Sequence, residues 1–254
     1  MRSLIVFFIT FGCIIGGVVL GMVIRAVLPD HHLSNDSKDV IKLGTGMIAT
    51  LAALVLGLLI ASAKSNFDTM NNGLVQAGSK IVLLDRIMAH YGPETKEIRD
   101  MLRQGVASTV DIIWANDSAG HVNEKVFHTR AGFETLQDKL RQLSPQDNAQ
   151  RWLQSQALQV SGEIAAVRWF LTEQKGHSSL PVPLIVLLVF WLVLIFFIFG
   201  LLSPRNETAI VVLLVCALSV AASLYMLLEL DNPFGGLITV SADPLRNALT
   251  YLGQ

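Results

Sequence analysis

The sequence is poor in charged residues. Asp, Glu, Lys and Arg make up 15% of its 254 residues, whereas soluble domains carry about 25%. The deficit is concentrated in four windows that contain none of these residues: 3–24, 43–63, 179–203 and 209–228. Each window reaches the roughly 20 residues that a helix needs to cross a hydrocarbon core about 30 Å thick. The lack of charge therefore argues against a soluble globule and predicts an all-α integral membrane protein with four transmembrane helices.

Residues that would carry chemistry are also scarce. The only cysteines, Cys13 and Cys216, lie inside apolar runs, where small unpaired packing residues are expected. The chain has no P-loop and no HExxH, GxSxG or CxxC pattern. His31 and His32 could bind a metal or sense pH, but adjacent residues on a loop rarely chelate one ion. We therefore expect no enzyme, no cofactor and no metal, and the net charge of −1 argues against a nucleic-acid partner.

The windows divide the chain into four segments. A signal peptide is the alternative for the first window, but that run is too long and only Arg2 precedes it. We interpret residues 1–63 and 179–230 as transmembrane hairpins, with a polar turn at 203–208 inside the second. The remaining segments are a region at 64–178 and a tail at 231–254.

The region at 64–178 has the pattern of a helical domain. Apolar residues recur at helical spacing in four stretches, and no strand-like alternation competes. The first stretch follows span two directly, since residues 63–72 contain neither Pro nor Gly. One uninterrupted helix is therefore expected to cross this boundary.

The distribution of basic residues predicts the topology. Fifteen Lys and Arg lie on the side shared by both termini and residues 64–178, and four lie on the other side. Because basic loops stay inside the cell, residues 64–178 and both termini are predicted to be cytoplasmic.

Spans one and two carry stripes of small residues. They are Gly12 with Gly16, Gly17 with Gly21, and Gly46, Ala49, Ala53, Gly57 and Ala61. Such stripes let helix backbones approach closely inside a membrane. Two interpretations stay open, which are packing within one subunit and assembly of several subunits around an axis.

Span two has a second, mostly bulkier face, which we take as the candidate pore lining. It consists of Ile48, Ala52, Val55, Leu59 and Ser62. Rings of such residues around an axis form an apolar constriction that can gate by dewetting.

Lysines stand at both ends of span two. Lys42 and Lys64 would attract anions if they formed rings at a pore mouth. Lysine is also an ordinary anchor at the ends of membrane spans, so the signal is weak.

A polar motif follows span four: Glu229, Asp231, Asn232, Pro233, Phe234 and Gly235. Its Asn-Pro and Gly-Gly pairs predict a turn at the membrane surface. Its carboxylates could bind a cation or pair with Lys64 or Arg168, and pairing is the commoner outcome. A short helix is expected to begin at Pro244, capped by Ser241 or Asp243.

Two stretches resemble a known family. The first, residues 73–103, contains Leu84-Asp85-Arg86, Tyr91-Gly92-Pro93 and Arg99-x-x-Leu102, and the second is the motif at 228–235. Together with the layout of hairpin, helical region and hairpin, they resemble the bestrophin-like domain family of bacterial membrane proteins. The second stretch is also similar to the segment after the last span of bestrophins.

The resemblance implies a homo-oligomer, a pentamer as in bestrophin anion channels, in a bacterial inner membrane with span two nearest the axis. The acids that bind Ca²⁺ in animal bestrophins are replaced here by residues 236–239, Gly-Leu-Ile-Thr, so calcium gating is not expected. The leading hypothesis is an oligomeric ion channel or pore that is selective for anions and lined by span two. The alternative is a non-conducting membrane scaffold or sensor whose cytoplasmic helices bind a protein partner.

Overall fold

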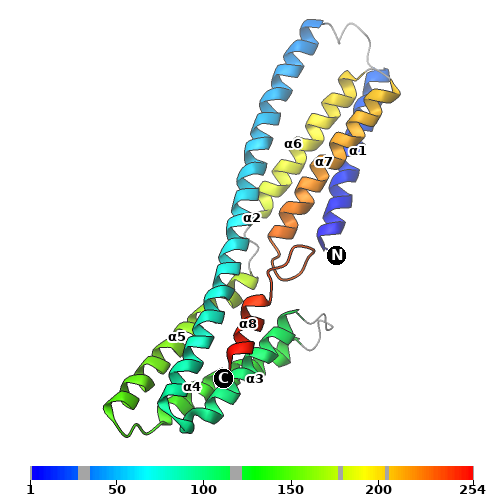
Figure 1. Ribbon diagram of the computed structural model, residues 1–254. Coiled ribbons are helices and arrows are strands. Elements are labelled where there is room, and N and C mark those ends of the chain that lie inside the picture. The colour runs from blue at the N-terminus through cyan, green and yellow to red at the C-terminus, as the bar shows by residue number, and fades with distance from the viewer. Residues whose placement is uncertain (1, 28–34, 115–121, 177–179, 204–205, 254) are drawn as a thin grey trace. The chain divides into compact units, whose positions relative to one another are not determined.

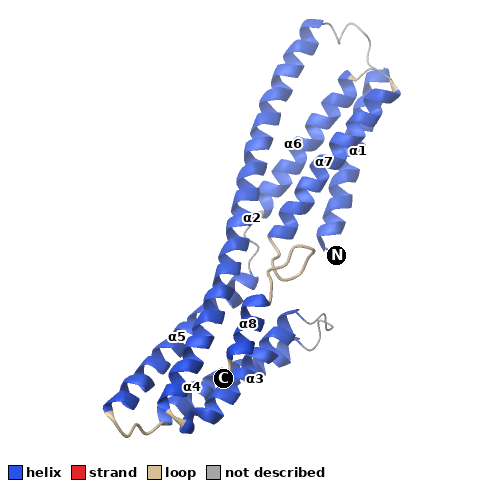
Figure 2. Ribbon diagram, in the orientation of Figure 1, coloured by secondary structure: helices blue, strands red, loops and turns tan. Residues whose placement is uncertain are grey.

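The computed structural model describes residues 2–27, 35–114, 122–176, 180–203 and 206–253. These residues form helices joined by short connections, with no strand among them (Figure 1, Figure 2). The predicted all-helical class is therefore confirmed for the described part of the chain. The chain divides into two compact units: unit 1 contains Met1–Phe67 and Ser178–Thr239, and unit 2 contains Asp68–His177 and Val240–Gln254.

Unit 1 contains the apolar helices. They are α1 (Arg2–Val27), the first part of α2 (Asn35–Tyr91), α6 (Val182–Leu202) and α7 (Glu207–Leu230). Each of the four has the length and composition needed to cross a membrane. Three of them contain one charge-free window each, and α6 lies inside the fourth. The transition into α6 is made by Pro181, whose carbonyl accepts hydrogen bonds from the N–H groups of Leu184 and Ile185.

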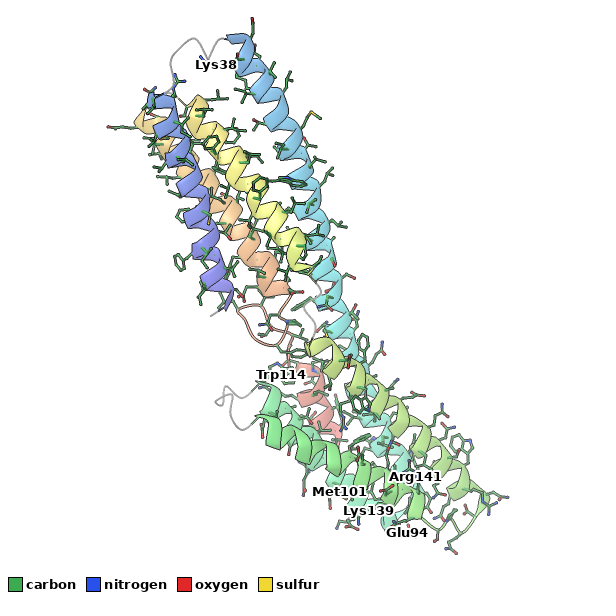
Figure 3. All side chains as sticks on the ribbon, turned by 180° about the vertical axis from the view of Figure 1, so that it is seen from behind. Lys38, Glu94, Met101, Trp114, Lys139 and Arg141 are labelled. Atoms are coloured by element: carbon green, nitrogen blue, oxygen red, sulfur yellow. The ribbon has the colours of Figure 1, made fainter. Side chains whose placement is uncertain are left out.

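Helix α2 runs for 57 residues without interruption, as its lack of Pro and Gly at residues 63–72 predicts. Lys38 lies near its first turn (Figure 3). The helix ends where Gly92 adopts a φ of 140°, a left-handed value that glycine tolerates and other residues rarely adopt. Pro93 follows and starts the short 3₁₀ helix η2 (Pro93–Thr95).

The core of unit 1 combines residues from all four of its helices. Its fully buried side chains include Ile14 of α1, Leu188 of α6 and Leu227 of α7, and α2 contributes Ala52, Leu59 and Ala63. One face of α2 is therefore covered by its own subunit.

Glycines on α1 and α6 allow these two helices to approach closely. A Cβ atom added at Gly17 would lie 2.9 Å from the carbonyl oxygen of Val193, and one at Gly21 would overlap the carbonyl oxygen of Phe197. Gly200 of α6 meets the carbonyl oxygen of Val18 in the same way. Gly17 and Gly21 are thus used for packing within one chain. A Cβ atom added at Gly12 or Gly16 would meet nothing within 4 Å, so both interpretations stay open for that pair.

Unit 2 contains the rest of α2 and the helices α3 (Lys96–Trp114), α4 (Val122–Gln142), α5 (Asn148–Gly176) and α8 (Asp243–Tyr251). The helices predicted for residues 64–178 are therefore present. The core side chains that are buried here include Leu84, Met88, Leu102, Leu136 and Leu140.

Helix α8 begins one residue before the predicted Pro244. The Ser241 hydroxyl accepts a hydrogen bond from the N–H of Asp243 at 3.0 Å, just ahead of the first turn. Leu245 and Leu252 are buried on its apolar side.

Candidate functional site

The candidate pore-lining residues of α2 lie mostly on its covered side. Ala52 and Leu59 retain only 3% and 2% of their surface and belong to the core of unit 1. Ile48 and Val55 are half-buried against that core, and Ser62 is exposed. A side chain packed in its own subunit cannot also face a shared axis, so Ala52 and Leu59 do not suit the role that the sequence suggested.

The opposite side of α2 is uncovered in the single chain. Its large side chains Met47, Leu51, Leu54 and Leu58 are 49–71% exposed. These residues lie one turn apart, at i, i+4, i+7 and i+11, and so share one face of the helix.

A row of small residues runs beside these side chains. Gly46, Ala53, Gly57 and Ala61 are all exposed, and a Cβ atom added at Gly46 or Gly57 would meet nothing within 4 Å. Gly46 and Gly57 therefore differ from Gly17 and Gly21 of α1, which face backbone atoms of α6. Ala49, the remaining member of the small-residue stripe of span two, packs against the core of unit 1. The other members of the stripe are not used within the chain.

The lysines at the ends of span two have local partners. Lys42 pairs with Asp39, one turn earlier, at 3.1 Å, and both side chains are exposed. The Lys64 ammonium lies 5.4 Å from the centre of the Phe67 ring. Such contacts leave both charges at the surface, where they remain able to attract ions.

The motif after α7 forms a compact turn. The N–H of Asn232 donates to the carbonyl of Glu229 at 3.2 Å, and the N–H of Gly235 donates to the carbonyl of Asn232 at the same distance. The Asn232 side-chain amide returns a hydrogen bond to the carbonyl of Gly235 at 3.1 Å. Pro233 is buried, whereas Asp231 and Phe234 are half-buried. The predicted turn is therefore present.

Glu229 fixes the end of this turn. Its side chain is buried, at 4% exposure, and its Oε2 accepts a hydrogen bond from the N–H of Leu237 at 2.5 Å. A Cβ atom at Gly236 would overlap the same carboxylate oxygen, so a larger residue there would displace the Glu229 side chain. The Tyr225 hydroxyl, one turn earlier on α7, also hydrogen-bonds to Glu229. The carboxylate thus holds main chain in place.

No group of three metal-ligating side chains occurs among the described residues. His31 and His32 lie outside them, as does Arg205. Cys13 and Cys216 are free thiols.

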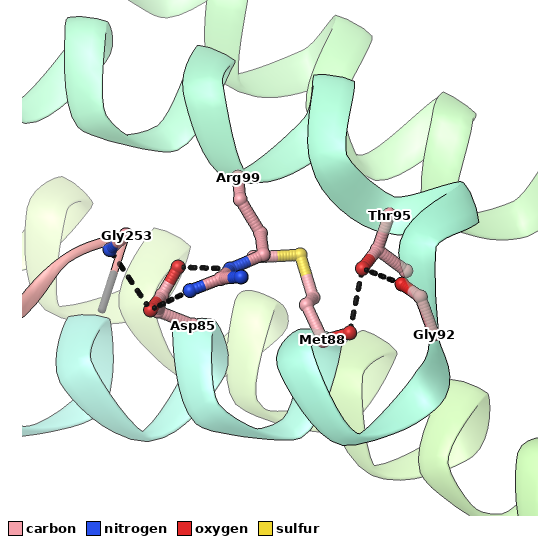
Figure 4. Close-up of polar contacts among 6 residues, drawn as sticks. All are labelled: Asp85, Met88, Gly92, Thr95, Arg99 and Gly253. Atoms are coloured by element: carbon pink, nitrogen blue, oxygen red, sulfur yellow. Dashed lines mark hydrogen bonds and ion pairs between the residues drawn. The ribbon is translucent and has the colours of Figure 1, made fainter.

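Residues 85–99 form a second polar centre, in unit 2 (Figure 4). Arg99 of α3 donates to both carboxylate oxygens of Asp85 on α2, at 2.7 and 2.9 Å, and the Asp85 side chain is only 1% exposed. The hydrogen bonds to Asp85 raise the pKa of the Arg99 guanidinium, so the guanidinium stays charged. The N–H of Gly253 adds a 3.3 Å hydrogen bond to the same carboxylate.

The turn between α2 and α3 is closed by Thr95. Its hydroxyl lies 2.5 Å from the carbonyl of Met88 and 2.9 Å from that of Gly92, and donates to this end of α2 (Figure 4). Tyr91 is buried beside it, and the resulting desolvation, followed by repulsion from Glu94, raises the pKa of its hydroxyl.

The sequence singled out these residues only through the family resemblance, and their partners were missed. Asp85 and Arg99 are 14 positions apart in sequence, on the two helices that a Gly-Pro turn joins. Two opposite charges placed in this way are the sequence signal from which the pair could have been predicted. Two hydrogen bonds that involve the C-terminal segment have no comparable signal in the sequence. Gly253 reaches Asp85, and the Trp114 indole at the end of α3 donates to the carbonyl of Val240 at 2.8 Å (Figure 3).

The long apolar helices with their exposed hydrophobic surfaces define a helical membrane protein. The family model of the Bestrophin-like domain matches residues 11–245. The chain therefore belongs to the bestrophin-like domain family.

The fold is that of a bacterial bestrophin homologue from Klebsiella pneumoniae. A crystal structure of a single-substitution variant of that protein is 12% identical, with a TM-score of 0.65 and 100% of both chains covered. A structure solved by zinc phasing is 15% identical, with a TM-score of 0.64 and coverage of 95% of this chain and 99% of the other. A structure described as a membrane protein is 13% identical, with a TM-score of 0.62 and full coverage of both chains. No curated protein matches this chain.

Proposed function

We propose that the protein is an oligomeric ion channel whose pore is lined by the exposed side of α2. One observation carries the proposal: α2 leaves a small-residue stripe uncovered directly beside a row of large apolar side chains. Of the four apolar helices, α2 also has the least buried apolar window, at 17%. A helix so exposed needs either lipid or another subunit around it.

The geometry of a helix separates two roles on this surface. Successive residues differ by about 100° around the helix axis, so Ala53 and Leu54 point about a quarter of a turn apart. In a ring of helices, a flank meets the neighbour and the side a quarter of a turn away faces the axis. Gly57 and Ala53 suit a close contact with the next subunit, which turns Leu54 and Leu58 toward the axis.

A ring of Leu54 and Leu58 would form an apolar constriction that gates by dewetting. Leu54 and Leu58 thus replace Ala52 and Leu59 as the proposed lining, because Ala52 and Leu59 are buried within the chain. The ions are proposed to be anions and the oligomer a pentamer, by analogy with bestrophins, and exposed Lys42 and Lys64 fit that preference.

The first experiment measures flux and oligomeric mass. The purified protein is reconstituted into liposomes, chloride and potassium fluxes are compared, and the mass is determined in detergent. A Leu54→Ala, Leu58→Ala variant should raise flux several-fold, because shortening the side chains widens and wets the constriction. The matched control is Leu218→Ala on α7, also half-exposed, which should leave flux unchanged.

The results separate the competing interpretations. A protein without flux of either ion would refute the channel, and a scaffold or sensor that binds a protein partner would then be favoured. Altered selectivity in Val55→Trp, with unchanged flux in the double leucine variant, would return the lining to the face predicted from the sequence. Gly57→Leu should break the oligomer, whereas Gly12→Leu, at an equally open position on α1, should not.

The chain is further proposed to cross a bacterial inner membrane four times with both termini and residues 64–178 in the cytoplasm. The excess of Lys and Arg on that side supports this orientation. Alkaline phosphatase fused after Gln142 should be inactive in cells, and strong activity there would invert the topology.

A further inference from the structure

Unit 2 contains a cavity at the start of α3. Its volume is about 320 Å³, at the lower end of the range of roughly 300–1,000 Å³ that is usual for small-molecule sites. The lining comes from the end of α2, the turn after it, one face of α3 and the C-terminal segment: Ala89, Gly92, Pro93, Thr95, Lys96, Arg99, Asp100, Arg103 and Gly253. None of these residues belongs to the proposed pore.

The cavity carries an excess of positive charge. Lys96, Arg99 and Arg103 line it at helical spacing on α3, and Asp100 is the only acid in the lining. The charge of Arg99 is matched by Asp85 behind it. Lys96 and Arg103 form no ion pair with any residue that the structure describes. Two cations with no partner therefore face one carboxylate.

Part of the cavity wall is fixed before any ligand arrives, although Lys96, Asp100 and Arg103 are exposed. Both oxygens of buried Asp85 hold the Arg99 guanidinium in place (Figure 4). The Thr95 hydroxyl is held by the carbonyls of Met88 and Gly92, which anchors the turn that forms one wall. A preformed site binds with less loss of conformational freedom than one that must order itself.

We propose that this cavity binds a compact organic anion that carries a carboxylate or phosphate group together with hydroxyl groups. Guanidinium and ammonium groups form strong charge-assisted hydrogen bonds with carboxylate and phosphate oxygens. Arg103 and Lys96 recognise the anionic group, and Asp100 accepts a hydrogen bond from a neighbouring hydroxyl. The volume suits a molecule the size of a hydroxylated tricarboxylate or a sugar phosphate.

The test measures binding of citrate and glucose 6-phosphate to the full-length protein in detergent. Calorimetry is used at concentrations up to about 10 mM, with glucose as the neutral control. Both anions should bind and glucose should not. Inorganic phosphate should bind more weakly, because it offers no hydroxylated carbon frame to Asp100.

Two substitutions at the cavity should weaken anion binding, and a third should strengthen it. Arg103→Gln and Lys96→Gln should each weaken binding about tenfold, because each removes a charge-assisted hydrogen bond. Asp100→Asn should tighten binding of inorganic phosphate, because it removes a like charge beside the anion. Arg141→Gln on α4, an exposed arginine paired with Asp138, is the control and should leave affinity unchanged.

Several results would overturn the proposal. It fails if neither anion binds, if Arg103→Gln and Lys96→Gln bind as tightly as the wild type, or if Arg141→Gln weakens binding equally. Ion flux is measured separately in the same preparations, so failure of this site and failure of the channel remain distinguishable.

Discussion

The helices within unit 1 are held together by other kinds of contact than the helices within unit 2. In unit 1 the closest approaches join glycine to backbone, as between Gly21 of α1 and Phe197 of α6. Among its described residues, unit 2 has one such approach, between Gly78 of α2 and the backbone of Pro244 in α8. It adds polar ties that the described part of unit 1 does not share, such as the buried pair of Asp85 and Arg99. The difference follows from the surroundings that each unit is suited to. Lipid gives apolar helices no reason to associate, so close packing must hold them together, whereas amphipathic helices in water bury apolar faces and can add ion pairs.

The largest loss of stability is expected when the buried ion pair of unit 2 is broken. Arg99→Gln leaves the Asp85 carboxylate buried without its cation, and such a loss costs about 3–5 kcal/mol. The melting temperature of the detergent-solubilised protein should fall by many degrees. Arg141→Gln is the control, since its ion pair is exposed and such pairs contribute about 0–1 kcal/mol.

A double variant tests the cause of that loss. Asp85→Asn combined with Arg99→Gln removes the buried charge, so its melting temperature should lie above that of Arg99→Gln alone. If the double variant is less stable than the single one, buried charge is not what destabilises the protein.

The next largest effect is expected when the close contact between α1 and α6 in unit 1 is disturbed. Gly21→Leu places a side chain against backbone atoms of α6, which cannot move aside as a flexible side chain could. Overpacking of this kind costs about 1–3 kcal/mol and sometimes more, so the yield of monodisperse protein in size-exclusion chromatography should fall sharply. Gly16→Leu on the same helix meets open space and should keep the wild-type yield. Equal loss in both variants would show that the α1–α6 contact is not the reason.

Much of the fold could be predicted because its signals are local. Lack of charge marked the four apolar helices, and the absence of Pro and Gly at residues 63–72 predicted the continuity of α2. The end of α2 is also encoded locally, by Gly92 with its φ of 140° and by Pro93 after it.

The functional face of α2 could not be assigned in the same way. Both of its faces are apolar or small, and lipid, a neighbouring helix and another subunit all accept such residues. The sequence pattern placed Leu59 in the lining and did not single out Leu58. Only the core of the folded chain separates the two side chains, at 2% and 66% exposure. The tether from Gly253 to Asp85 is 168 residues long in sequence and was equally hidden.

The smallest expected effect concerns a half-buried ion pair of unit 2. Lys80 of α2 lies 3.2 Å from Glu163 of α5, and the hydrogen bonds from Lys80 and then Gln159 lower the pKa of the Glu163 carboxyl below its ordinary value of 4.5. A carboxyl with a lowered pKa stabilises the folded state above its ordinary pKa, and that contribution is lost as the pH falls through the lowered value.

Glu163→Gln should therefore lower the melting temperature slightly at about pH 7, and the difference from wild type should vanish toward about pH 3. In about 1 M salt the difference at pH 7 should also shrink, because screening then acts within about 3 Å. A difference that persists unchanged at low pH would mean that Glu163 acts through packing, and unit 2 would then resemble unit 1 more than its ion pairs suggest.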